Sequence, residues 1–179
     1  MRDRHVSLLR GINVGGHNVI RMGRLRQLYE SAGCTEVETY LQSGNVVYRH
    51  DDGQADVTPI IESALVTELG REVPVLGRSH AELQHIVDTD PYPGVEPACH
   101  LVLFLSAAPA PSVARELGRT TSGADEAILL GEEFHLYCPS GLATTKLTGL
   151  LSDRRLGVTA TGRNWRTVSR LLELSAAAD

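Results

Sequence analysis

A proline-rich segment near the middle of the chain, residues 91–97, most constrains what this sequence can fold into. It holds three of the eight prolines in a chain of 179 residues. Proline lacks a backbone donor and fixes φ, so neither a helix nor a central strand can continue through this stretch. We therefore predict a linker here, between an N-terminal subdomain over residues 1–92 and a C-terminal subdomain over residues 98–179.

The same order of elements is predicted on both sides of this linker. Apolar periodicity and turn signals indicate a strand, a helix, a two-stranded hairpin, a helix, a strand and a helix in each half. These elements cover residues 5–10, 22–32, 37–41, 46–49, 57–69, 73–77 and 79–87, then 100–105, 112–119, 127–131, 134–138, 144–153, 157–161 and 164–175. The β-α-β-β-α-β order is typical of the ferredoxin-like motif. The sequence thus predicts an α+β fold of two tandem ferredoxin-like subdomains, with antiparallel or mixed sheets and helices on one face.

Composition narrows the class of protein. Hydrophobic residues make up 42% of the chain, which is enough for a packed core. Too few apolar residues precede Arg10 for a signal peptide, and no stretch approaches a membrane span. The cysteines, Cys34, Cys99 and Cys138, are odd in number and lie far apart, unlike a secreted disulfide framework. We therefore predict a reduced, cytoplasmic protein with no membrane partner.

The histidines and cysteines give no sign of a metal centre. None of the seven histidines is placed in H-x-x-x-H spacing, and no C-x-x-C pair occurs. The sequence therefore predicts neither a metal site nor a cofactor.

Four short polar segments are candidates for a binding site. They lie at residues 10–18, 42–45, 144–147 and 161–166, and all fall in the basic ends of a chain with net charge −5. Residues 1–49 carry seven Arg against four acidic residues, whereas the middle of the chain is strongly acidic. An anion is therefore expected at these segments. The candidate ligand-binding residues are Arg10, Asn13, Gly15, Gly16, Asn18, Gln42, Ser43, Asn45, Lys146, Arg163, Asn164 and Arg166.

These segments also carry a resemblance to a known family. The relevant residues are Leu8-Leu9-Arg10-Gly11-Ile12-Asn13-Val14-Gly15-Gly16 with Asn18, Gln42-Ser43-Gly44-Asn45-Val46-Val47, Lys146-Leu147, and Thr161 with Arg163-Asn164-Trp165-Arg166-Thr167-Val168. Over essentially its full length the chain resembles the bacterial family catalogued as domain of unknown function 1697. It departs at Thr145, where the family usually has serine, and at Gly162, where threonine is usual. The resemblance implies a cytoplasmic bacterial protein and no particular activity.

Each polar segment also has an ordinary structural interpretation. The glycines and asparagines of residues 10–18 suit a tight turn, and those of residues 42–45 suit a hairpin. On the predicted last helix, Arg163, Arg166 and Arg170 fall opposite an apolar face that includes Trp165, as in a solvated surface helix.

Three hypotheses on function therefore stay open. The first is a non-catalytic binding module for a phosphorylated ligand, either a nucleotide or a short RNA. The second is an enzyme acting on a small phosphorylated or amide substrate, with His17 as acid or base. In the third, the motifs are purely structural and only hold the two halves of the chain together. The sequence predicts no oligomeric state.

Overall fold

The computed structural model describes residues 4–16, 18–50 and 56–176. It is an α+β structure with two antiparallel sheets, which confirms the predicted class. The chain forms two compact units, one of residues 1–84 with 171–179 and one of residues 85–170. The linker at residues 91–97 between two subdomains stays a prediction.

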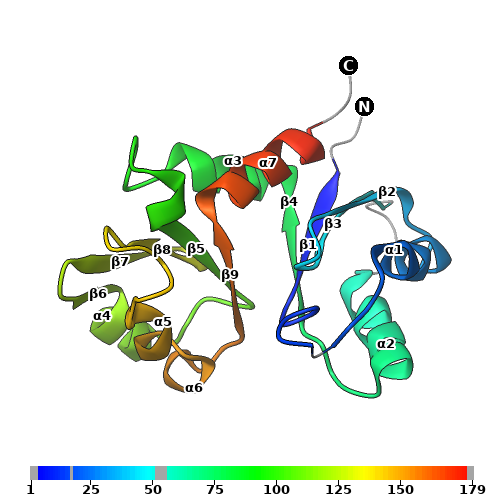
Figure 1. Cartoon of the computed structure of the whole chain (residues 1–179), viewed down its shortest axis with the longest axis horizontal. Helices are drawn as coiled ribbons and strands as arrows, with labels where there is room; N and C mark the ends of the chain where they lie inside the picture. Colours follow the sequence, from blue (N-terminus) through cyan, green and yellow to red (C-terminus); the bar gives the residue numbers. More distant parts are fainter. Residues whose placement is uncertain (1–3, 17, 51–55, 177–179) are drawn as a thin grey trace. The chain divides into compact units, whose positions relative to one another are not determined.

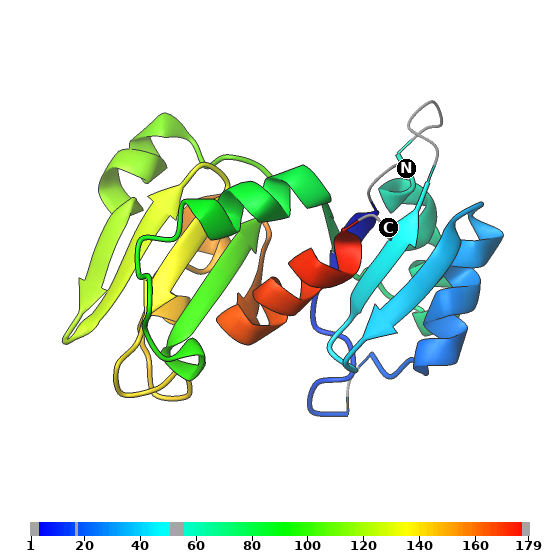
Figure 2. The same ribbon diagram turned by 90° about the horizontal axis from the view of Figure 1, so that it is seen from above.

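The sheet of the first unit has four strands in the order β2-β3-β1-β4, with every neighbouring pair antiparallel. Its elements are β1 (His5–Leu9), α1 (Met22–Ser31), β2 (Thr35–Tyr40), β3 (Asn45–Arg49), α2 (Thr58–Leu69) and β4 (Val75–Ser79). Helices α1 and α2 lie on one face of this sheet (Figures 1 and 2). Tyr29 of α1 and Ile61 of α2 are fully buried in the same core as Leu9 and Val46 of the strands.

The sheet of the second unit has five strands in the order β6-β7-β8-β5-β9. Its elements are β5 (His100–Leu105), α4 (Pro111–Leu117), β6 (Arg119–Ser122), β7 (Asp125–Leu130), β8 (Glu133–Tyr137), α5 (Leu147–Leu150), α6 (Asp153–Leu156) and β9 (Ala160–Asn164). Helices α4, α5 and α6 lie on one face (Figure 1). Leu147 and Leu156 from these helices share a buried core with Phe134 and Leu105. A short 3-10 helix, η1 (Pro97–Cys99), leads into β5.

A helix follows the last strand of each sheet directly: α3 (His80–Asp88) after β4, and α7 (Trp165–Ser175) after β9. Helix α3 begins with a capping box. The backbone N–H of Ser79 donates to Glu82 Oε2 at 2.7 Å, and the N–H of Glu82 donates to Ser79 Oγ at 3.2 Å. At α7, Asn164 Oδ1 accepts a hydrogen bond of 2.9 Å from the backbone N–H of Thr167.

Some predicted elements differ from the structure, most of them in the second unit. The helix expected over residues 144–153 is replaced by a loop and the short helices α5 and α6, and β6 was not predicted. The strand expected over residues 157–161 is β9, which lies at 160–164, and that expected over 73–77 is β4, at 75–79. Both strands end in Gly-Arg-polar sequences of low strand propensity that are held by pairing with β1 or β5. Pairing of this kind cannot be inferred from local periodicity.

Strands at matching positions in the two sheets pair in the same register. Val6 in β1 lies opposite Arg78 in β4 and Val47 in β3. Val102 in β5 lies opposite Arg163 in β9 and His135 in β8. Each arginine follows a glycine, is 7% exposed, and donates through Nη1 to the carbonyl of that glycine at 2.8 Å.

Among the described residues, no helix combines the length and the apolar character that a bilayer crossing requires.

Candidate functional site

Two of the four polar segments meet at one end of the first sheet, where β1 ends and β2 turns into β3 (Figure 1). The backbone N–H of Leu9 donates to the carbonyl of Gly44 at 2.8 Å. The side-chain amide of Asn13 donates to the carbonyl of Gln42, also at 2.8 Å. Residues 10–16, 18 and 42–45 therefore lie together, and we call them the loop site.

The asparagines of the first segment hold its backbone in place. Asn13 donates through Nδ2 to the carbonyl of Ile20 at 3.1 Å and accepts from the backbone N–H of Ile20 at 2.9 Å. Asn18 donates through Nδ2 to the carbonyl of Gly11 at 2.9 Å. Both asparagines have positive φ, 54° and 50°, a conformation that Asn tolerates better than most residues. Their side chains thus do what the turn interpretation expects.

The tip of this segment is exposed. Val14, Gly15 and Gly16 are all solvent-exposed, and the two glycines have φ of 57° and 77°. The backbone N–H groups of these three residues make no hydrogen bond to another described residue. A turn that presents successive unbonded N–H groups is an environment in which proteins bind anions.

The hairpin turn is tightly built beneath its exposed residues. Gln42 and Ser43 are exposed, whereas Asn45 is fully buried and donates through Nδ2 to the carbonyl of Tyr40 at 2.8 Å. Gly44 has φ of 81°, and a Cβ there would lie 2.8 Å from Ile12 Cδ1. Only glycine fits this position without displacing the loop.

Arg163 lies elsewhere than predicted. It is in strand β9, not on the exposed side of the last helix, and only 7% of it is exposed. Its Nη1 donates to Thr161 Oγ1 at 2.9 Å and to the carbonyl of Gly162 at 2.8 Å. Burial lowers the pKa of Arg163 to about 10. The predicted arginine face of the last helix is therefore reduced to Arg166 and Arg170, both exposed.

The other predicted residues of the second unit have mixed environments. Lys146 is exposed at the start of α5, and its neighbour Leu147 is fully buried in the core. Asn164 caps α7 with its side chain. The candidates at Lys146, Arg163, Asn164 and Arg166 thus belong to the second unit, and those of the loop site to the first. His17 lies outside the described residues.

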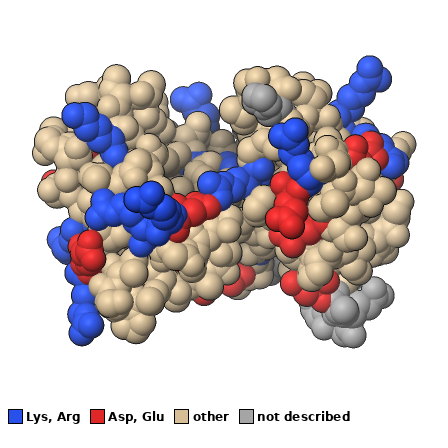
Figure 3. Space-filling view, turned by 90° about the horizontal axis from the view of Figure 1, so that it is seen from below, with Lys and Arg blue, Asp and Glu red and all other residues tan. Residues whose placement is uncertain are grey.

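On the face drawn in Figure 3, Lys and Arg form separate groups within each unit, with Asp and Glu beside some of them. The described residues of either unit, taken by itself, therefore present no continuous basic track on this face of the kind that follows a nucleic acid backbone.

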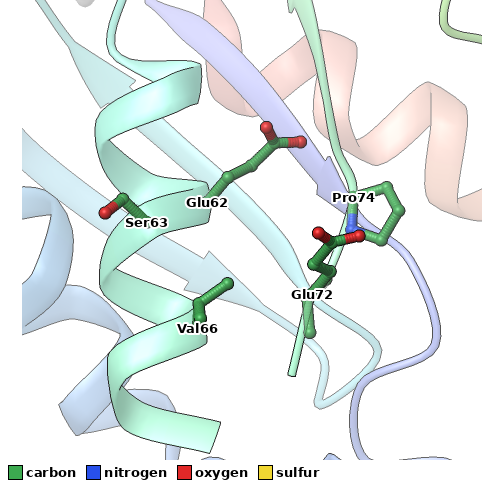
Figure 4. A pocket seen from close by; sticks show the side chains of 6 residues that line it. Glu62, Ser63, Val66, Glu72 and Pro74 are labelled. Carbon is green, nitrogen blue, oxygen red and sulfur yellow. The ribbon is translucent and has the colours of Figure 1, made fainter. Parts of the chain in front are cut away.

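A pocket of about 310 Å³ lies between α2 and the segment that leads into β4. Glu62, Ser63, Val66, Glu72, Val73 and Pro74 line it. Figure 4 shows Glu62 and Glu72 extending into the space between the two segments. Glu62 accepts a hydrogen bond of 2.9 Å from the backbone N–H of Val75, so it also fastens β4 to α2. None of the predicted site residues lines this pocket.

The second unit contains a titratable cluster that the sequence analysis did not find. Asp90, His100 and His135 lie within 4.8 Å of one another through one donor atom each. The residues are 10 and 35 positions apart and come from a loop, β5 and β8, so no spacing motif could show them. The sequence clue is weak: a histidine in each of two strands that are expected to pair.

Comparisons with known proteins agree with the fold. A structure titled as that of a conserved bacterial protein from Streptococcus pneumoniae matches with a TM-score of 0.78 and 20% sequence identity, and the match covers 98% of this chain and 100% of that one. At this identity the similarity concerns the fold alone. None of the curated proteins compared with the chain matches it.

A family model described as "Protein of unknown function (DUF1697)" matches residues 2–135. These residues include both segments of the loop site, whereas Lys146 and residues 161–168 lie beyond them. By sequence, then, this chain belongs to the DUF1697 family.

Proposed function

We propose that the loop site binds a small phosphorylated ligand without transforming it. The observation that carries the proposal is the exposed run of backbone N–H groups at Val14, Gly15 and Gly16, which make no hydrogen bond to another described residue. Three N–H groups in one turn suit the oxygens of a phosphate.

The construction of the loop supports this proposal. Asn13 and Asn18 fix the backbone through their side chains, so the N–H groups of the tip are held in place before a ligand arrives. Preorganised donors bind more tightly because less conformational entropy is lost on binding. Arg10, at the start of the segment, is fixed by a backbone hydrogen bond of 2.9 Å to the carbonyl of Pro74 and brings positive charge to the site.

The size of the ligand follows from the charge distribution. The separate basic groups on the drawn face of the first unit in Figure 3 favour a compact anion such as a nucleotide or a sugar phosphate over a longer RNA. Of the twelve predicted ligand residues, we retain Arg10, Gly15 and Gly16 as direct contacts, with Gln42 and Ser43 as exposed neighbours. The catalytic alternative depends on His17 and stays a prediction.

The test is an NMR titration of ¹⁵N-labelled protein with inorganic pyrophosphate. We expect saturable shifts of the Val14, Gly15 and Gly16 amides, and a roughly tenfold weaker affinity in Arg10→Gln, because a charge-assisted hydrogen bond contributes about 1.5 kcal/mol. Arg166→Gln, an exposed arginine of the second unit, is the control and is expected to bind as wild type. Amides that do not respond, or equal weakening in the control, would overturn the proposal. So would a short RNA that binds through Arg166 while pyrophosphate does not bind.

Two finer expectations are also proposals. We propose that each unit is a ferredoxin-like βαββαβ fold, the second with β6 added at its edge. The strand orders β2-β3-β1-β4 and β7-β8-β5-β9 support this proposal.

We also propose a cytoplasmic location in a bacterium, supported by the three free cysteines.

A further inference from the structure

We propose that Asp90, His100 and His135 bind a divalent transition-metal cation, with zinc as the first candidate. The donor atoms are Asp90 Oδ1, His100 Nε2 and His135 Nδ1, all in the second unit. This site is separate from the loop site, and the argument for it does not depend on anion binding.

The separations of the donor atoms fit a common cation. His100 Nε2 lies 3.2 Å from His135 Nδ1, and Asp90 Oδ1 lies 3.8 Å and 3.9 Å from these two nitrogens. A tetrahedral zinc ion, about 2.0–2.1 Å from each ligand, spaces its ligands about 3.3–3.4 Å apart. The cluster therefore needs adjustments of no more than about half an ångström to close around the ion.

Hydrogen bonding alone does not account for the cluster. The carboxylate of Asp90 is too far from either imidazole for a hydrogen bond. The two imidazoles can share only one proton, and their outer nitrogens, His100 Nδ1 and His135 Nε2, are buried with no partner among the described residues. A cation would engage the lone pairs of both inner nitrogens together with the carboxylate, and would place the imidazole protons on the outer nitrogens.

Burial also keeps both imidazoles in the form that binds metals. His100 and His135 are fully buried. Burial of this kind disfavours a charged imidazolium, so it favours the neutral imidazole that ligation requires. Buried neutral imidazoles with one carboxylate form a mixed N and O set, which suits zinc, cobalt or iron(II) better than calcium or magnesium.

The neighbours of the cluster fix its rings. The indole of Trp165 stacks on His100 with ring centroids 4.4 Å apart and an angle of 12° between planes. The backbone N–H of Tyr92 donates to Asp90 Oδ1 at 2.9 Å, which orients the carboxylate. The donors are thus positioned before any ion binds, and the single tryptophan of the chain stands beside the site as a reporter.

The experiment is a titration of chelator-treated wild type with Co²⁺, followed by visible absorption and by Trp165 fluorescence. We expect one Co²⁺ per chain, the intense d–d bands of tetrahedral coordination, quenching of Trp165 by the adjacent ion, and displacement of Co²⁺ by Zn²⁺. Asp90→Asn, which keeps the shape of the side chain, is expected to bind at least tenfold more weakly. The control His85→Gln, at an exposed histidine outside the cluster, is expected to bind as wild type.

Absence of tetrahedral bands in wild type would overturn the proposal, as would bands that are unchanged in Asp90→Asn. Loss of binding in His85→Gln would assign the ion to His85 and would also overturn the proposal. If Asp90→Asn does not fold, His135→Gln takes its place, and quenching of Trp165 in wild type still decides whether the ion lies beside His100. The pyrophosphate titration reads the backbone amides of the loop site, whereas the Co²⁺ titration reads visible absorption and Trp165 fluorescence. Each proposal can therefore fail without the other.

Discussion

Gly44 shows how closely a residue in the loop site is tied to the core beneath it. Its φ is 81°, and a Cβ at this position would lie 2.8 Å from Leu9 Cβ and from Ile12 Cδ1. The sequence indicated a turn here, because Gly and Asn are ordinary hairpin residues. The contact with Ile12 joins this turn to a segment more than 30 residues earlier, and no local signal in the sequence could reveal it.

We expect Gly44→Ala to lower the free energy of unfolding by about 2–4 kcal/mol, because it combines an unfavourable φ with overpacking. The matched control is Gly16→Ala, which has φ of 77° and no atom within 4 Å of the added methyl. The control is expected to lose only about 1 kcal/mol. Urea unfolding of both variants measures the difference. Equal losses would mean that the crowding at Gly44 is relieved by movement of the loop.

Asn164 lies at the start of a helix, as predicted, but its side chain caps the helix. From the sequence, Asn164 is a candidate ligand-binding residue at the start of a predicted helix. In the structure its side chain accepts from the backbone N–H of Thr167, which is the bond of an N-cap. Amide side chains at helix starts serve both purposes, so the sequence alone could not separate them.

At the scale of a single element, the cap predicts a specific stability effect. Asn164→Ala is expected to lower the free energy of unfolding by about 1 kcal/mol. Asn164→Asp is expected to keep most of the stabilisation that the cap provides, since Asp also caps helices. Thermal or urea unfolding measures both. If Asn164→Ala were as stable as wild type, the hydrogen bond to Thr167 would have no role in holding α7.

Strands β2 and β3 are linked by an ion-pair network that the sequence did not predict. Glu36 lies 2.8 Å from Arg49 of β3 and 3.1 Å from Arg4, and Arg4 is also 3.6 Å from Glu38. Glu36 has φ of 48°, and the pairing of β2 with β3 shifts register between Thr35 and Glu38. Such a bulge redirects side chains, so strict alternation of residues could not place these charges.

This network predicts how stability depends on pH. The Arg49 guanidinium, together with Arg4, lowers the pKa of Glu36 from 4.5. The stabilisation is therefore fully present above pH 4.5 and is lost as the pH falls through the lower, folded value. We expect Glu36→Gln to make the loss of stability between about pH 5 and pH 3 shallower than in wild type.

The control for the pH experiment is Glu30→Gln, the same charge change at an exposed residue of α1. Urea midpoints measured across this pH range are expected to follow wild type in the control. Parallel curves for wild type and Glu36→Gln would show that the ion pairs seen here do not stabilise the folded state in solution.

At the scale of the whole molecule, the order of elements was the most predictable property of the chain. The strands and helices of the first unit follow the predicted order, and the second unit adds β6 and divides one expected helix into α5 and α6. Local periodicity suffices for elements such as α1 and β5. It fails for residues 144–153, whose path is set by packing of Leu147 and Leu151 into the core.

The candidate sites were predictable to a smaller extent. The two segments of the loop site were both identified from their glycines and asparagines, and the structure joins them. The cluster of Asp90, His100 and His135 was missed because it forms only when β5 pairs with β8 and the loop at Asp90 lies beside them. When a site forms by the pairing of strands that are distant in the sequence, the spacing of its residues along the chain does not reveal it.

The shared register of the two sheets allows residues at matching positions to be compared. Val47 in the first sheet occupies the place that His135 has in the second. Counted along the chain, Arg4, two residues before Val6, corresponds to His100, two residues before Val102. The same pattern of pairing thus forms with valine and arginine at these two positions in the first unit and with two imidazoles in the second. The imidazoles at these positions are therefore not needed to build a sheet of this kind.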